Sequence, residues 1–199
     1  VAHLNWLDPE ITNLVPVLKS YWLMIHVSII TASYGFFSLG SILGLIALCL
    51  IIFTNSDNKS KLKDTLTEIT IINEKTLEIG LFMLAIGTFL GGVWANESWG
   101  RYWGWDPKET WALVSILIYT FVLHIRFIPS LRNPLIFNIL SMFSIWTIIM
   151  TYFGVNYYLS GLHSYAAGDP MPIPSFVYYL SALMFILALS AKLRFKKNY

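Results

Sequence analysis

Residues 21–53 read YWLMIHVSIITASYGFFSLGSILGLIALCLIIF and contain no Asp, Glu, Lys or Arg. A helix needs about 20 consecutive apolar residues to cross the roughly 30 Å hydrocarbon core of a bilayer. This stretch is longer, so we expect it to begin above the membrane or to tilt strongly. Its length suits a helix rather than a barrel strand, and the sequence therefore predicts a membrane-spanning α-helix.

Further apolar stretches of sufficient length lie over residues 77–96, 110–128, 134–157 and 175–193. Hydrophobic residues make up 56% of the 199 residues and charged residues 12%, which excludes a soluble domain of ordinary composition. We therefore predict an all-α fold, a polytopic transmembrane helical bundle of about five spans that forms a single membrane domain over residues 1–199. The lipid bilayer is its expected surrounding, and no nucleic acid is expected among its partners.

The basic residues predict the orientation of this bundle. Ten of the 13 Lys and Arg side chains fall on one face, namely Lys59, Lys61, Lys63, Lys75, Arg126, Arg132, Lys192, Arg194, Lys196 and Lys197. The positive-inside rule makes this face cytoplasmic, so an odd number of spans places the N-terminus outside and the C-terminus inside. We expect an exterior leader over residues 1–20, an exterior segment over 94–111, an exterior loop over 157–174, and a partly helical cytoplasmic loop over 54–75.

Two features limit what the chain can be. Cys49 is the single cysteine, so the chain carries no Cys-x-x-Cys-His site for covalent haem attachment and is not itself a c-type cytochrome. The first residue, Val1, is not an initiator Met, and no signal peptide opens the sequence. We expect the chain to be a portion of a longer polypeptide.

Residues 94–111 read WANESWGRYWGWDPKETW and hold five of the eight Trp residues. An aromatic belt at the membrane interface is one explanation. However, Gly100 and Gly104 alternate with the rings, and Gly permits a backbone to approach a flat ligand such as a porphyrin closely. The series Asp106, Pro107 and Glu109 matches a helix N-cap with its capping box, so we favour a structural role for Asp106 and Glu109 over a catalytic one.

The run Trp99-Gly-Arg-Tyr-Trp-Gly-Trp-Asp-Pro107 resembles the tryptophan-rich WWD signature of haem-handling proteins. The ending Asp-Pro-Lys-Glu-Thr, and the earlier run LVPVLKSYWLMIHV over residues 14–27, are similar to the CcsA or ResC-type, system II cytochrome c synthetases. The resemblance implies a haem-lyase (holocytochrome c synthase) component with haem b as substrate and bound ligand. It also implies an apocytochrome c substrate, a ResB/CcsB partner that is separate or fused, and a reaction site at Trp99, Trp103, Trp105 and Asp106.

Two histidines are expected near the exterior face. His26 lies close to the outer end of the first span, and His163 lies in the last exterior loop. By position they match the two exterior haem-ligand histidines of the family, and two neutral imidazoles can ligate one haem iron. The rings of the Trp segment would cover this haem, with Arg101 as the candidate partner for a propionate.

His124 is expected at the opposite face. It lies eighteen residues after Asp106, which at 1.5 Å per residue places it about 27 Å deeper. It therefore cannot share an iron with the exterior pair. The resemblance makes it one ligand of an inner haem site, with Arg126 or Arg132 for the propionates and a second ligand from the ResB/CcsB component. His3 has no motif around it and is expected to be a surface residue.

The resemblance implies that haem enters near His124, passes outward, and is attached to the thiols of an apocytochrome Cys-x-x-Cys-His sequence. A CcmC-type haem exporter, which delivers haem without making thioethers, is an alternative, as is a membrane b-type cytochrome. A pure scaffold would give the glycine-spaced Trp residues no purpose. We expect an integral protein of the bacterial cytoplasmic membrane with its active face to the periplasm; the thylakoid membrane is the alternative.

Overall fold

A computed structural model of the protein describes residues 20–163 and 172–198. His3 and all but the last residue of the predicted leader lie outside the described residues, as does the middle of the predicted loop 157–174. The described chain is helical, without strands. Its elements are α1 (Tyr21–Phe53), α2 (Lys59–Trp99), α3 (Pro107–His124), the 3-10 turn η3 (Ile125–Phe127), α4 (Pro134–Ile149), the π turn η4 (Met150–Gly154), α5 (Val155–Tyr158) and α6 (Ser175–Asn198).

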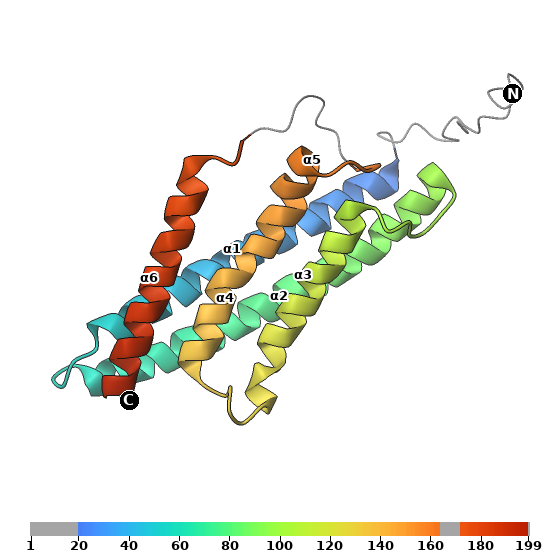
Figure 1. The fold of residues 1–199 in the computed structure, drawn as a ribbon. Helices are drawn as coiled ribbons and strands as arrows, with labels where there is room; N and C mark the ends of the chain where they lie inside the picture. Colours follow the sequence, from blue (N-terminus) through green and yellow to red (C-terminus); the bar gives the residue numbers. More distant parts are fainter. Residues whose placement is uncertain (1–19, 164–171, 199) are drawn as a thin grey trace, which may run out of the picture.

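Five helices are long and apolar enough to cross a membrane. They are α1, α2, α3 with η3, α4 through α5, and α6. The predicted all-α fold with five spans is therefore confirmed. Helices α1 to α4 form the body of the bundle, and α6 packs along one side of it against α1 and α4 (Figure 1).

The elements of the bundle meet at two ends (Figure 1). At the first, which we call the tryptophan end, lie the start of α1, the end of α2, the start of α3, α5 and the start of α6. At the opposite, basic end lie the turn after α1, the connection from η3 to α4, and the end of α6. The described parts of the three predicted exterior segments thus share one end of the molecule.

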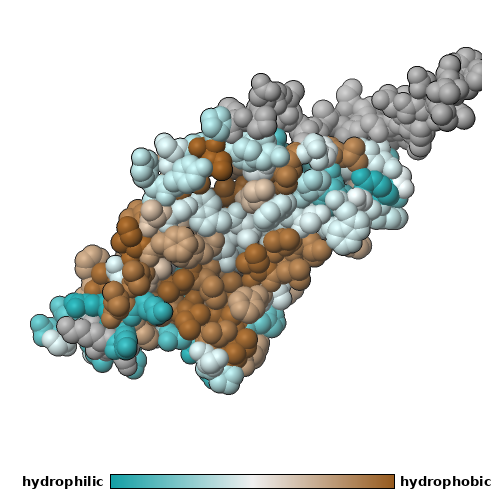
Figure 2. Space-filling view, viewed as in Figure 1, coloured by the Kyte–Doolittle hydropathy of each residue, from teal (hydrophilic) through white to brown (hydrophobic). Residues whose placement is uncertain are grey.

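The surface agrees with this division (Figure 2). Apolar residues cover the middle of the visible face, and strongly hydrophilic residues gather at the basic end. An apolar middle flanked by polar ends is the pattern that a bilayer requires of a bundle that crosses it.

Helix α2 is longer than the sequence predicted. Residues 54–75 were expected to be a partly helical loop, but the helix begins at Lys59 and runs for 41 residues. At 1.5 Å per residue it is about 60 Å long, roughly twice the hydrocarbon core. Its polar first half is held as helix by contacts that a composition argument does not see, because Leu66 and Asn73 on that half are buried against neighbouring helices.

Polar side chains join α1, α2 and α4 inside the bundle. The Asn73 amide of α2 donates to Asn138 Oδ1 at 3.1 Å and to Ser141 Oγ at 2.9 Å, both on α4. Ser141 Oγ in turn donates to the Gly40 carbonyl of α1 at 2.9 Å. In a membrane, hydrogen bonds of this kind and close packing hold helices together, because lipid is as apolar as the helix surfaces. The network fixes the scaffold on which the tryptophan end is built.

Candidate functional site

A cavity lies at the tryptophan end between α1, α2, α3, η4 and the connection from α2 to α3. It holds about 530 Å³ of empty space, part of it open to the outside. Its walls are formed by His26, Ile30, Tyr34, Thr88, Gly91, Gly92, Tyr102, Trp103, Lys108, Glu109, Ala112, Thr151 and His163. Sites for small molecules combine apolar walls with a few polar groups. The walls of this cavity have that composition.

The side chain of His26 extends from α1 into the cavity and packs against α2. Its Nδ1 lies 2.6 Å from the Gly87 carbonyl oxygen. A Cβ at Gly91 would come within 2.5 Å of the ring, so only glycine leaves room for the imidazole there. Because a carbonyl can only accept, Nδ1 must carry the proton, and in the neutral ring Nε2 is then an unprotonated nitrogen. That nitrogen is able to coordinate a metal.

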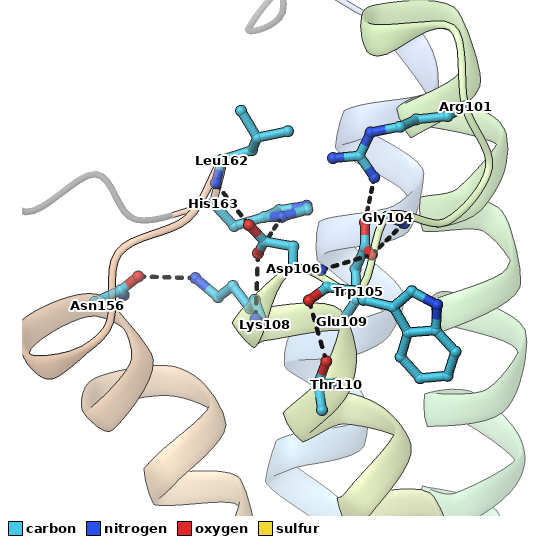
Figure 3. Close-up of polar contacts among 10 residues, drawn as sticks. All are labelled: Arg101, Gly104, Trp105, Asp106, Lys108, Glu109, Thr110, Asn156, Leu162 and His163. Atoms are coloured by element: carbon cyan, nitrogen blue, oxygen red, sulfur yellow. Dashed lines mark hydrogen bonds and ion pairs between the residues drawn. The ribbon is translucent and has the colours of Figure 1, made fainter.

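His163 reaches the same cavity from the turn that follows α5. Its Nδ1 faces Asp106 Oδ2 (Figure 3), at a distance of 2.9 Å. The His163 side chain is 13% exposed. Burial lowers the pKa of His163, although the hydrogen bond to Asp106 acts in the opposite direction. The ring therefore favours the neutral form, and donation from Nδ1 to the carboxylate again leaves Nε2 for coordination.

Trp94 connects the two histidines. It is 1% exposed, and its ring lies parallel to that of His26 with centroids 6.2 Å apart. The His163 ring lies 5.5 Å from the same indole. Trp99 packs edge-on against both Trp94 and His163, at 4.7 and 4.9 Å. No motif in the sequence predicted a role for Trp94, and only its position in the Trp-rich segment 94–111 could have indicated one.

Asp106 caps helix α3 as the sequence predicted. Its side chain accepts the Lys108 backbone N–H, while Glu109 Oε2 accepts the N–H groups of Gly104 and Asp106 at 2.8 and 3.2 Å. Pro107 occupies the first turn, so the capping box is confirmed. Two further contacts of Asp106 were not predicted: Oδ1 accepts the Leu162 N–H at 2.6 Å, and Oδ2 meets His163 (Figure 3).

The three predicted platform tryptophans occupy different places. Trp103 lines the cavity, whereas Trp99 packs behind His163 and is not part of the cavity wall. Trp105 is 70% exposed and lies edge-on to Trp103 at 5.8 Å. Its φ of 58° is a left-handed conformation that costs a bulky residue energy and is found mostly where the surrounding structure or a function requires it.

The two glycines of the motif have local roles. Gly100 ends α2 in the left-handed conformation, with φ of 68°, as helix C-caps often do. At Gly104, a Cβ would collide with the guanidinium of Arg101. Gly104 thus allows close approach of Arg101, and the prediction that these glycines allow close approach to a ligand stays a prediction.

Lys108, not Arg101, is the cation at the cavity. Arg101 lies over Trp99 and is 3.8 Å from Glu109 Oε1, and it is not part of the cavity wall. The half-buried Lys108 lines the wall, and its Nζ donates to Asn156 Oδ1 at 3.0 Å (Figure 3). Of these two cations, Lys108 lines the cavity, and the assignment of Arg101 to a propionate stays a prediction.

At the basic end, Arg126 forms an ion pair with Glu74, and together with Arg132 it lines a second pocket. The inner haem site stays a prediction. His124 is exposed outside this pocket, and its Nδ1 donates to the Thr120 carbonyl of its own helix at 2.7 Å. Within residues 20–163 and 172–198, no group of three or more His, Cys, Asp or Glu is placed to hold a bare metal ion.

Comparison with known proteins assigns the chain to a family. Residues 2–163 match the profile described as cytochrome C assembly protein. The chain belongs to this family. It is similar to Protein NrfI of Wolinella succinogenes, with 57% identity over 171 residues that cover 86% of this chain and 19% of NrfI. It is also similar to the cytochrome c biogenesis protein CcsA of Prochlorococcus marinus, with 40% identity over 77% of this chain and 57% of that protein, and to CcsA of Chlamydomonas reinhardtii, with 39% identity over 78% and 44%.

These relatives confirm the CcsA-type resemblance that the motifs indicated. The chain is an integral membrane member of the cytochrome c assembly family, and its role belongs to cytochrome c maturation. It spans less than two thirds of the length of each of these relatives.

Proposed function

We propose that this chain binds haem b at the tryptophan end, between His26 and His163, and there attaches it to apocytochrome c. One observation carries the proposal. Both imidazoles line the same cavity, and each has Nδ1 hydrogen-bonded to an acceptor, so each can offer Nε2 to one iron.

The residues suit haem better than a bare metal ion. Haem iron already has four porphyrin nitrogen ligands, so two histidines complete its coordination. Ile30, Tyr34 and Trp103 provide apolar and aromatic surface for the macrocycle, and Lys108 provides a charge for a propionate. The exposed ring of Trp105 lies outside the cavity, where an incoming protein substrate would meet it.

The proposed reaction needs no nucleophile from this chain. The S–H bond of each substrate cysteine adds across one haem vinyl group. Sulfur bonds to the vinyl carbon next to the ring, the proton goes to the terminal carbon, and the C=C π bond is consumed, with no net oxidation or reduction. The contribution of this chain is to hold the vinyl groups where the thiols arrive, and such positioning can lower a barrier by several kcal/mol. The substrate histidine then replaces His26 or His163 on the iron, which releases the product.

Supply of haem is assigned to the basic end. His124 and the pocket with Arg126 and Arg132 lie there. Because His124 is exposed, a haem iron bound to it could take its second ligand from another polypeptide. A ResB/CcsB component, separate or fused, is the proposed source. In this proposal the tryptophan end faces the periplasm from the bacterial cytoplasmic membrane, or the lumen from a thylakoid membrane.

The test uses the purified 199-residue chain produced in cells that make haem. We expect an absorption spectrum of six-coordinate haem in the wild type, and less haem in His26→Ala and His163→Ala, with partial recovery when imidazole is added. Apocytochrome peptide with Cys-x-x-Cys-His should then acquire haem that resists acid–acetone extraction, whereas a peptide with both Cys changed to Ser should not. Haem without thioether formation would favour a CcmC-type exporter, and full haem in the double His variant would refute the site.

A further inference from the structure

Asp106 makes more contacts than a helix cap requires. It is 6% exposed, and its carboxylate accepts from three donors. One donor, the Lys108 N–H, belongs to the cap of α3. The other two donors are Leu162 N–H and His163 Nδ1 (Figure 3), which lie 56 and 57 residues after Asp106 in the sequence. The loop is pressed against the carboxylate, because a Cβ at Gly161 would collide with Asp106 Oδ1.

The chemistry at this point distinguishes aspartate from other capping residues. Ser, Thr, Asn and Asp all cap helices with similar strength, so capping alone does not require a carboxylate. An ionised carboxylate has only acceptor oxygens, however, and it can accept at both of them. With one oxygen bound to Leu162 and the other facing the ring of His163, the ring nitrogen must be the donor. Asparagine has one acceptor oxygen, and serine is too short to reach both partners.

We propose that Asp106 is a positioning residue: it selects the Nδ1–H tautomer of His163 and anchors the loop of His163 to the start of α3. Nε2 is thereby presented to the cavity in the form that coordinates iron. The role in haem binding rests on the function proposed above. The tautomer itself is a property of the protein without haem, so the two ideas can be tested apart.

The expected loss of haem affinity on removing Asp106 can be scaled from other metal sites in which a hydrogen-bond partner orients a ligating histidine. A partner that orients a ligating histidine commonly changes metal affinity or activity on the order of 10–100-fold. The carboxylate also makes the imidazole a stronger electron donor, which stabilises oxidised iron. Loss of Asp106 should therefore lower haem retention and raise the reduction potential of the haem that remains.

The first experiment determines which ring nitrogen of His163 carries the proton, in the 199-residue chain without haem. In ¹⁵N-histidine spectra, with the signals of His163 identified by their loss in His163→Ala, we expect protonated Nδ1 in the wild type. In Asp106→Ser, which retains a capping oxygen, the proton should move toward Nε2. Protonated Nε2 in the wild type, or an unchanged signal in Asp106→Ser, would overturn the proposal.

The second experiment reads haem per folded protein. We expect a loss of 10–100-fold in Asp106→Ser, recovery with imidazole, and no further loss when Asp106→Ser is added to His163→Ala in the presence of imidazole. Asn58→Ser is the matched control, because Asn58 precedes α2 at the basic end, accepts the Asn55 N–H and lines neither pocket, and it should keep its haem. A further loss in the double variant would mean that Asp106 acts on the fold and would overturn the proposal. If the His163 proton shifts in Asp106→Ser but the wild type binds no haem, the proposed function is overturned and the role of Asp106 in selecting the tautomer stands.

Discussion

Replacing Gly91 by Ala should reduce haem binding without unfolding the protein. A Cβ at this position would lie 2.5 Å from Cε1 and 2.7 Å from Nδ1 of His26, whereas ordinary contacts lie at 3.4–4 Å. The imidazole must therefore move by about 1 Å, and a displacement of about 1 Å can cost about 10²-fold in a positioned reaction. The ring can make this move only by weakening its hydrogen bond to Gly87 or its packing on Trp94.

The change in folding stability should be smaller than the change in haem binding. Inserting a methyl group into a packed region costs about 1–3 kcal/mol, and replacing a glycine inside a helix by Ala returns about 0.5–1 kcal/mol. The net loss is thus at most about 2.5 kcal/mol. The 10²-fold loss expected at the haem site corresponds to about 2.7 kcal/mol.

Gly35→Ala is the matched control. Gly35 lies on the same helix as His26, and a Cβ there would meet nothing within 4 Å. Both variants are purified in detergent, and haem per folded protein is measured from absorption spectra with and without imidazole. We expect Gly35→Ala to match the wild type and Gly91→Ala to lose haem that imidazole partly restores. If Gly91→Ala keeps the haem content and spectrum of Gly35→Ala, His26 does not ligate haem from its position in this structure.

Three further predictions concern the surroundings of the site. Lys108→Gln should lower haem retention more than Arg101→Gln, measured as haem remaining after gel filtration, because Lys108 lines the cavity and Arg101 does not; equal losses would contradict this. The free energy of unfolding in detergent should be about 1 kcal/mol higher for Trp105→Gly than for Trp105→Ala, because glycine adopts the left-handed φ of residue 105 without strain. His124→Ala should lower the haem content of protein made in cells yet leave the purified protein able to bind added haem. Failure of a well-folded His124→Ala protein to take up added haem would refute an inner supply site.

The spans and the cap could be predicted because they depend on local properties of the sequence. The first span was expected over residues 21–53, and α1 occupies Tyr21–Phe53. An apolar run of sufficient length must form a helix in lipid whatever surrounds it, since its backbone has no other hydrogen-bonding partner. The capping box of Asp106 and Glu109 is likewise complete within four residues and needs no distant partner.

The sequence by itself thus determined the membrane helices, the cap of α3 and the family, and it named two histidines that line one cavity. Only the tertiary structure decided that Trp94 packs against both of them, that Lys108 rather than Arg101 lines the cavity, and that Asp106 bonds to His163. The length of α2 was also decided there, by burial of Leu66 and Asn73. These features arise where different helices and loops pack together, and they join residues 56 or more positions apart in the sequence. Such contacts leave no periodicity or spacing along the chain, so the sequence could not predict them.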